Sequence, residues 1–136
     1  MRLVFDSSSP ALCVGLFCSE KGWLFVRTRH EQEPQQSKLL FRQIQESLSE
    51  SSVSIDQVES LGLGLGPGSY TGLRVGLTLA KVWSFSKQIP LYWFSSDKIF
   101  SSADTEPNLK LLVASDFCLA EEIDVLQPIY QNDHFK

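Results

Sequence analysis

The stretch LGLGLGPGSYTGLRVG, residues 61–76, contains the passage from a strand to a helix on which the fold of this chain depends. Its first six residues alternate leucine with glycine, which is the period of a β-strand with two different faces. Glycine along one face of a strand marks a close approach by another backbone or by a ligand. The glycine-rich turn at 66–69 then leads into a helix predicted over Thr71–Ser86.

The same turn is a candidate anion site. A strand, a glycine turn and a helix in succession point several backbone N–H groups toward one spot at the helix N-terminus. The turn lacks the lysine of a Walker A loop and the spacing of GxGxxG, and a tight turn that permits close packing is the alternative. The residues predicted to contact a phosphate or nucleotide are Asp6, Ser7, Gly66, Gly68 and Ser69.

Apolar patterning places further elements on both sides of this segment. Strands are predicted over 3–5, 11–18 and 23–28, and an amphipathic helix over 36–50 with Leu40, Phe41, Ile44 and Leu48 as its stripe. Later elements are a strand over 89–94, a short helix from Ser95 or Ser96 to Ala103 and a strand over 109–113. A strand meander followed by a strand–helix–strand unit indicates an α/β fold with a mixed sheet.

The 71–86 helix is apolar on nearly every side, with Arg74 and Lys81 as its charged residues. A helix of this kind must be buried on both sides. Small residues recur along it every four positions, at Gly72, Gly76 and Ala80. Either the 36–50 helix covers its whole surface, or the small residues receive a helix of another molecule. We expect the second, because a chain of this size has few elements left to cover both faces.

Length and composition limit the class of protein. The 136 residues amount to about one domain, and 43% hydrophobic with 21% charged residues excludes a disordered or fibrous chain. No apolar run approaches the roughly 20 residues of a membrane span, and Asp6 interrupts the N-terminal apolar stretch of a would-be signal peptide. We therefore expect a cytoplasmic protein. A net charge of −4 argues against a chain that grips nucleic acid alone.

Residue types that build catalytic or metal sites are few. The three cysteines form no CxxC pair, which argues against a disulfide framework and a zinc site. His30 and His134 lack the spacing of a metallohydrolase, so no metal site is expected. Ser69 has no convincing partner base, and we expect no catalytic residue in this chain.

Residues 66–76, GPGSYTGLRVG, resemble the GPGSFTGLRIG signature of the TsaB (YeaZ) family. LVFDS at 3–7 is similar to the family's opening ILAIDTS, and 90–96 to the strand and serine turn after its second helix. QSKLL at 36–40 resembles its HSExLLP helix start, with Gln36 in place of histidine and Phe41 in place of proline. The resemblance covers residues 1 to about 103.

This resemblance implies a ribonuclease H-like fold of the actin/Hsp70/sugar-kinase superfamily, with helices flanking a mixed sheet. It also implies a non-catalytic subunit that pairs with TsaD, which together with TsaE transfers a threonylcarbamoyl group to the adenosine beside the tRNA anticodon. The chain lacks the histidine pair with which TsaD-type proteins coordinate metal, so TsaD activity is not expected. Contact with tRNA would be indirect, and ATP or ADP would bind only at a composite site with partners.

Family members pair through their first two helices, either with TsaD or with a second TsaB copy. The partner interface predicted on that basis comprises Gln36, Leu39, Leu40, Gly72, Leu73, Arg74, Gly76, Leu77, Ala80 and Lys81. The alternative function is that of an actin-like nucleotide phosphohydrolase or a glycoprotease-like peptidase. In that case Asp6, at the end of the first strand, would have the position at which actin-like ATPases hold metal-bound phosphate. The alternative is that Asp6 has a purely structural role as a turn residue.

Two regions are expected along the chain. Residues 1–103 form a TsaB-like N-terminal domain, and 104–136 a remnant of the second actin-like subdomain with the C-terminal tail. Family members continue into a longer second subdomain, yet PIY at 128–130 still resembles their terminal PxYLR motif. We therefore expect an internally shortened second lobe.

Overall fold

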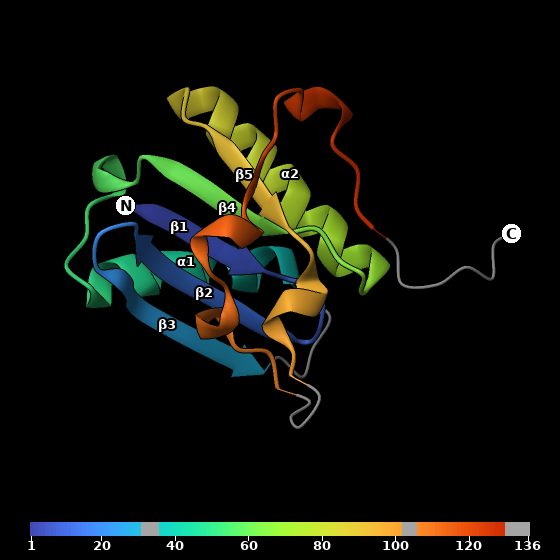
Figure 1. Cartoon of the computed structure of the whole chain (residues 1–136), viewed down its shortest axis with the longest axis horizontal. Coiled ribbons are helices and arrows are strands. Elements are labelled where there is room, and N and C mark those ends of the chain that lie inside the picture. The colour runs from blue at the N-terminus through green and yellow to red at the C-terminus, as the bar shows by residue number, and fades with distance from the viewer. Residues whose placement is uncertain (31–35, 102–105, 130–136) are drawn as a thin grey trace, which may run out of the picture.

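A mixed sheet of six strands, in the order β3-β2-β1-β4-β5-β6, organises the computed structural model (Figure 1). The structure describes residues 1–30, 36–101 and 106–129. The strands are β1 (Arg2–Asp6), β2 (Ala11–Cys18), β3 (Gly22–His30), β4 (Ser60–Gly64), β5 (Leu91–Phe94) and β6 (Cys118–Leu119), and the helices α1 (Gln36–Glu50) and α2 (Tyr70–Lys87). Short 3-10 turns are η1 (Ile55–Gln57), η2 (Ser96–Ile99), η3 (Leu109–Leu111), η4 (Ala114–Asp116) and η5 (Ile123–Val125).

The strand pairing follows the predicted order of elements. β1, β2 and β3 form the expected antiparallel meander. β4 then pairs parallel to β1, and β5 parallel to β4, because α1 and α2 carry the chain back across the sheet between these strands. The carboxyl ends of β1 and β4 consequently meet at one edge, which brings Asp6 beside the glycine turn.

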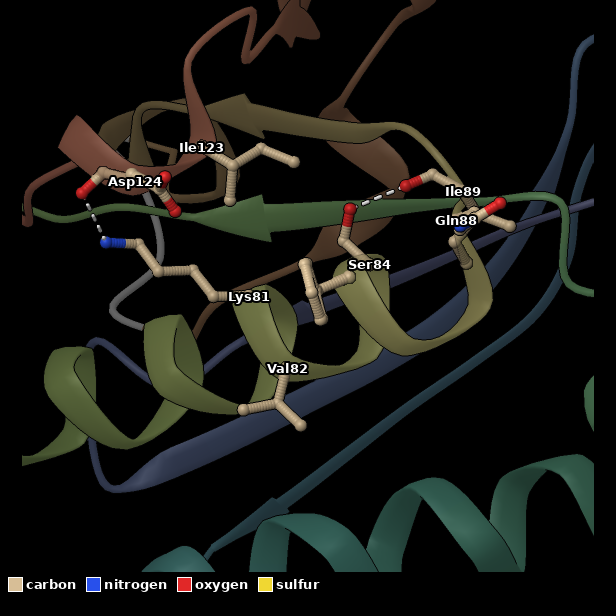
Figure 2. A pocket seen from close by; sticks show the side chains of 8 residues that line it. Lys81, Val82, Ser84, Gln88, Ile89, Ile123 and Asp124 are labelled. Carbon is tan, nitrogen blue, oxygen red and sulfur yellow. Dashed lines mark hydrogen bonds between the residues drawn. The ribbon is translucent and has the colours of Figure 1, made fainter.

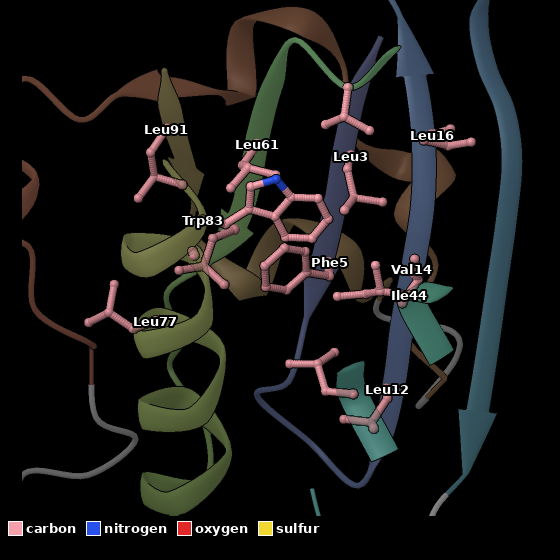
Figure 3. Packing of buried hydrophobic residues seen from close by; sticks show 14 of the residues in the cluster. Leu3, Phe5, Leu12, Val14, Leu16, Ile44, Leu61, Leu77, Trp83 and Leu91 are labelled. Carbon is pink, nitrogen blue, oxygen red and sulfur yellow. The ribbon is translucent and has the colours of Figure 1, made fainter. Parts of the chain in front are cut away.

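Both helices cover one face of the sheet. The alternate β1 residues Leu3 and Phe5 point to this face, where Trp83 of α2 packs among leucines of the neighbouring strands (Figure 3). α1 buries Leu40, Ile44 and Leu48 of its predicted stripe. The prediction that Phe41 belongs to this buried stripe is wrong. Its side chain is 48% exposed, because Phe41 lies one position away from the buried row.

α2 ends where its last turn closes on the following loop. Gln88 adopts the left-handed conformation at φ 53°, which ends many helices and lets the last carbonyl groups find donors. The Ser84 hydroxyl donates to the carbonyl oxygen of Ile89 at 2.5 Å (Figure 2), and Pro90 has no N–H with which to continue a helix. None of the described helices is long and apolar enough to cross a membrane.

The second face of the sheet is covered by the segments that follow β5. Val4 and Cys13 point to this face and pack with Phe94, Ile99, Leu109 and Leu112. β6 extends the same sheet by pairing antiparallel to β5. Residues 106–129 thus pack onto the sheet of the first region, and the assignment of 104–136 as a remnant of a second subdomain stays a prediction.

Two predicted elements of this region are wrong. The strand over 109–113 is instead the turn η3, because the Asn108 side chain accepts from the Lys110 N–H and Leu109 and Leu112 enter the core three residues apart. The helix from Ser95 or Ser96 to Ala103 is the single turn η2, since Phe100 becomes extended and Asn108 N–H donates to Ile99 O. Its predicted end lies outside the described residues.

Leu109→Ala tests how firmly the segment after β5 is bound to the sheet. Leu109 is fully buried, so the cavity should lower the free energy of unfolding by about 2–5 kcal/mol in urea denaturation. Leu111→Ala is the matched control, because Leu111 lies on the same turn with 43% of its surface exposed, and should cost less than about 0.5 kcal/mol. Equal effects of the two substitutions would contradict the packing described here.

Candidate functional site

Asp6 joins three segments at the carboxyl end of β1. Its carboxylate accepts from the N–H and hydroxyl of Ser8, at 2.8 and 2.5 Å, and from the hydroxyl of Ser96 at 2.6 Å. Ser96 is also bonded to the glycine turn, since its hydroxyl oxygen accepts from Gly66 N–H at 2.9 Å and its own N–H donates to Gly66 O at 2.7 Å. Burial raises the pKa of Asp6, although the bonds from Ser8 and Ser96 oppose the shift.

The glycine face of β4 is approached by the chain itself. A Cβ on Gly62 would lie 2.8 Å from the Phe117 ring, and one on Gly64 would overlap the Asp6 carboxylate. Gly66, at φ +104°, is in contact with the carbonyl oxygen of Ile129, whose N–H donates to Leu65 O at 2.7 Å. The close approach predicted from the alternating glycines is therefore made by three parts of the same molecule.

The five residues predicted to contact a phosphate come together but are bonded to one another or to their neighbours. Ser69 N–H donates to Ser8 O at 2.8 Å, and the Ser69 hydroxyl accepts from Gly72 N–H as the N-cap of α2. The Ser7 hydroxyl donates to Gly72 O at 2.7 Å, and Gly68 packs on the backbone of Ser8. This is the geometry of a close-packed turn, and phosphate binding at it stays a prediction.

Histidine and metal-ligating residues are dispersed. His30 Nε2 lies 2.8 Å from Glu106 Oε2 at the end of β3, and His134 lies outside the described residues. Across the described parts of the chain, no three His, Cys, Asp or Glu side chains are grouped so as to hold a metal ion. Burial raises the pKa of the Cys13 thiol to about 12, which makes it a core residue rather than a nucleophile.

The small-residue stripe of α2 faces the chain's own sheet. Gly76 packs against the Ser7 hydroxyl and Leu63, so a side chain at this position would collide with the sheet. Buried members of the predicted partner interface are Leu40, Gly72, Leu73, Gly76, Leu77 and Ala80. Within this chain these six positions are buried, and at Gly76 the sheet takes up the close approach that the stripe permits. Their part in a partner interface stays a prediction.

The other predicted interface residues have different positions. Arg74 is exposed, Lys81 is half-buried, and Leu39 packs partly against the core. The side chain of Gln36 lies outside the described residues. Whether any of them touches a partner stays a prediction.

A groove of about 490 Å³ runs between α1 and α2, and we call it the helix-pair groove. Its lining residues are Phe41, Arg74, Val75, Thr78, Leu79 and Val82. Phe41 and Val82 are 48% and 58% exposed, and Val75 and Leu79 between them are only partly buried, so the groove presents a contiguous apolar surface. Of these lining residues, only Arg74 was predicted from the sequence to lie at an interface. The pattern that could have identified the others is a second apolar row on α2, with Val75, Leu79 and Val82 at i, i+4 and i+7.

Comparisons with known proteins identify relatives of this sequence. The family model described as TsaD, tRNA N6-adenosine threonylcarbamoyltransferase, matches residues 31–113, more than half of the chain. A curated protein of Haemophilus influenzae named tRNA threonylcarbamoyladenosine biosynthesis protein TsaB is 32% identical over 90 residues, covering 65% of this chain and 36% of its own length. The protein of the same name from Escherichia coli is 26% identical over 95 residues, covering 69% and 39%. The chain thus spans well under half the length of the curated relatives it matches.

Solved structures share the fold. YeaZ from Pseudomonas aeruginosa superposes with a TM-score of 0.65 at 23% identity, covering 72% of this chain and 45% of that one. A second structure, titled an uncharacterized protein with similarity to peptidase YEAZ from Pseudomonas aeruginosa, gives 0.64 at 21% identity and covers 88% and 62%. The α/β fold expected from the resemblance is confirmed.

Asp6→Asn tests the buried carboxylate by the pH dependence of stability. Burial raises the pKa of Asp6 in the folded chain, whereas in the unfolded chain the pKa of an aspartate is about 3.9. As pH rises from that value, the unfolded state loses its proton first, so the free energy of unfolding falls by at most about 1.4 kcal/mol per pH unit. In urea unfolding, the stability of the wild type minus that of Asp6→Asn should decrease between about pH 4 and about pH 7.

The control for this experiment is Asp97→Asn, because Asp97 is exposed on η2 next to Ser96. Asp97→Asn should change the free energy of unfolding by less than about 0.5 kcal/mol, as expected for a substitution of an exposed side chain. A difference for Asp6→Asn that is flat or rises with pH would show that the folded state does not raise the pKa of this carboxyl group.

Proposed function

Because this chain belongs to the TsaD family and, within it, to the TsaB (YeaZ) proteins, we propose that it acts in tRNA threonylcarbamoyladenosine biosynthesis. Its role is that of a non-catalytic subunit that docks on a TsaD-type protein. The observation that carries this proposal is the helix-pair groove, an apolar surface left uncovered on a domain whose glycine turn is closed by its own side chains.

The shape of the groove suits a helix of another protein. A row of apolar side chains on α2, Val75, Leu79 and Val82, forms one wall of the groove, and the single side chain of Phe41 on α1 forms the other. An amphipathic helix laid into such a groove would bury its own apolar face against this row and Phe41. Association would thereby remove from water the exposed apolar area of Phe41 and Val82.

Charge favours a TsaD-type partner over a second copy of this chain. Two charged residues of α2 lie at or next to the groove, Arg74 in its lining and Lys81 beside Val82, and both are basic, although the whole chain carries −4. Two copies paired through α2 would bring like charges together, whereas a partner with carboxylates beside its apolar face would be attracted. A homodimer is therefore the less favoured pairing.

The proposed role leaves catalysis, nucleotide and tRNA to the assembled complex. Asp6 and Ser69 are both engaged within the chain, which supports a non-catalytic subunit over a nucleotide phosphohydrolase or a peptidase. ATP or ADP, and a TsaE-type ATPase, would then bind at surfaces shared with the partner. The net charge of −4 supports an indirect contact with tRNA.

Phe41→Asp tests the proposed docking surface. The purified full chain and the TsaD-type protein of the same genome should form a one-to-one complex in size-exclusion chromatography with light scattering. A carboxylate in the groove should weaken this complex by at least about 30-fold, as expected for a central apolar contact. Phe41 is half exposed, so the chain itself should stay folded.

Leu111→Asp is the control, because Leu111 has a similar exposure of 43% and lies on the opposite face of the sheet. It should bind like the wild type. The absence of any complex with the wild type, or equal binding by the two variants, would refute the proposal. Gly76→Leu is unsuitable for this purpose, because Gly76 packs on Ser7 and the variant would disturb the fold.

A further inference from the structure

A hollow of about 480 Å³ lies at the end of the sheet where β1 and β4 begin, and we call it the Arg2 hollow. Its lining residues include Arg2, Phe17, Glu20, Glu59, Tyr92 and Phe117. Arg2 shares its face of the sheet with Val4, because residues two apart on a strand point the same way. The hollow is therefore separate from the glycine turn, which follows the other end of β1, and from the helix-pair groove on the opposite face.

The guanidinium group of Arg2 is held in a fixed orientation. Its Nε donates to the Ser60 hydroxyl at 3.0 Å. Its Cζ lies 3.8 Å from the centroid of the Tyr92 ring and 4.8 Å from that of the Phe117 ring. A guanidinium carries five N–H donors in one plane, so contacts at its faces and at Nε leave donors at the Nη edge for a further acceptor.

This half-buried cation has no carboxylate partner within the described part of the chain. Arg27, by contrast, lies with Nη2 2.6 Å from the Glu50 carboxylate. Burial lowers the pKa of Arg2, and its interactions with Tyr92 oppose this shift. Arginine nevertheless stays charged in proteins. A charged group that is partly removed from water without a counter-charge favours the carboxylate of a ligand.

Two carboxylates line the same hollow and argue against a simple anion as this ligand. Glu59 lies with Oε2 3.8 Å from the Met1 amino group. Glu20, in the turn between β2 and β3, is exposed and forms no ion pair with a described residue. In the same turn, backbone N–H groups of Lys21 and Glu20 lower the pKa of the Cys18 thiol, which favours a further negative charge. This side of the hollow therefore favours a cation.

The remaining wall is apolar. The rings of Phe17 and Phe117 lie side by side with their centroids 5.7 Å apart, and both are only partly buried. The hollow thus offers a cation, a carboxylate and an aromatic surface to one ligand. Its volume of about 480 Å³ lies within the range of about 300–1,000 Å³ that is typical of small-molecule sites.

From this arrangement we infer that the Arg2 hollow binds a small zwitterion, an α-amino acid with an apolar side chain. Its carboxylate accepts from the Nη groups of Arg2, its ammonium group lies toward Glu20, and its side chain packs on Phe17 and Phe117. The inference does not rest on the function proposed above, because no residue of the helix-pair groove takes part in it.

The ligand class is tested with L-phenylalanine as the probe. It is titrated into the isotope-labelled full chain without an N-terminal tag, because Met1 lines the hollow, and binding is followed by NMR. Saturable binding is expected with a Kd below about 1 mM. Phenethylamine, which lacks the carboxylate, should bind at least about tenfold more weakly. 3-Phenylpropanoate, which lacks the ammonium group, should bind at least about threefold more weakly.

Substitutions on the two charged sides locate the site. Arg2→Met should weaken L-phenylalanine binding by at least about tenfold, whereas Arg42→Met is the control, because Arg42 is exposed on α1 outside the hollow. Glu20→Gln should weaken it by about two- to fivefold, as expected for an exposed ion pair. Glu121→Gln, an exposed control outside the hollow, should bind like the wild type.

The outcomes leave the inference either supported or refuted. If L-phenylalanine does not bind, if either analogue binds as tightly, or if Arg2→Met binds like the wild type, the hollow is not a zwitterion site. If Arg2→Met fails to fold because it loses the stacking on Tyr92, Glu20→Gln and the two analogues decide, since Glu20 is exposed in a turn. Selective loss of binding with Arg2→Met and Glu20→Gln supports the site.

Discussion

The hydrogen bonds around Asp6 connect segments of the molecule that lie up to 90 residues apart in the sequence. One carboxylate accepts from the turn after β1 and from Ser96 after β5, and Ser96 in turn is bonded to Gly66 after β4. A buried carboxylate is costly unless its oxygens are satisfied. Each of the three segments must therefore take up its position for the others to be stable, and this requirement places the N-terminus of α2 over the sheet.

The position of α2 on the sheet determines which side of the helix is buried and which side stays exposed to solvent. The row of small residues lies against β1 and β4, where Gly76 allows the helix to approach Ser7. The row with Val75, Leu79 and Val82 is turned toward α1 but is covered only in part, since Val82 is 58% exposed. An apolar helix packed on a single sheet and beside a single short helix thus leaves an uncovered surface, which is the basis of the proposed pairing.

The segment after β5 serves two different surfaces. Leu109 and Leu112 close the second face of the sheet, and Ile129 contacts Gly66 at the glycine turn. Between them, η5 lies beside the end of α2 and borders a hollow there. The same short stretch of chain therefore completes the core and enlarges the exposed apolar surface, with no regular second lobe in the described residues.

Local periodicity was enough to predict the meander, the bounds of α1 and the approach to the glycine face of β4, because alternation and helical spacing are properties of neighbouring residues. The family could likewise be recognised from the GPGSYTG turn and its flanks. Periodicity failed at 109–113, where a leucine-rich run forms a 3-10 turn because its side chains must reach a core already built by β1 and β2. It also could not tell which row of α2 is buried, since both rows are apolar. Only the tertiary structure decided that point, because the buried bonds of Asp6, Ser7 and Ser96 set the rotation of α2 on the sheet, and these partners lie up to 90 residues apart in the chain.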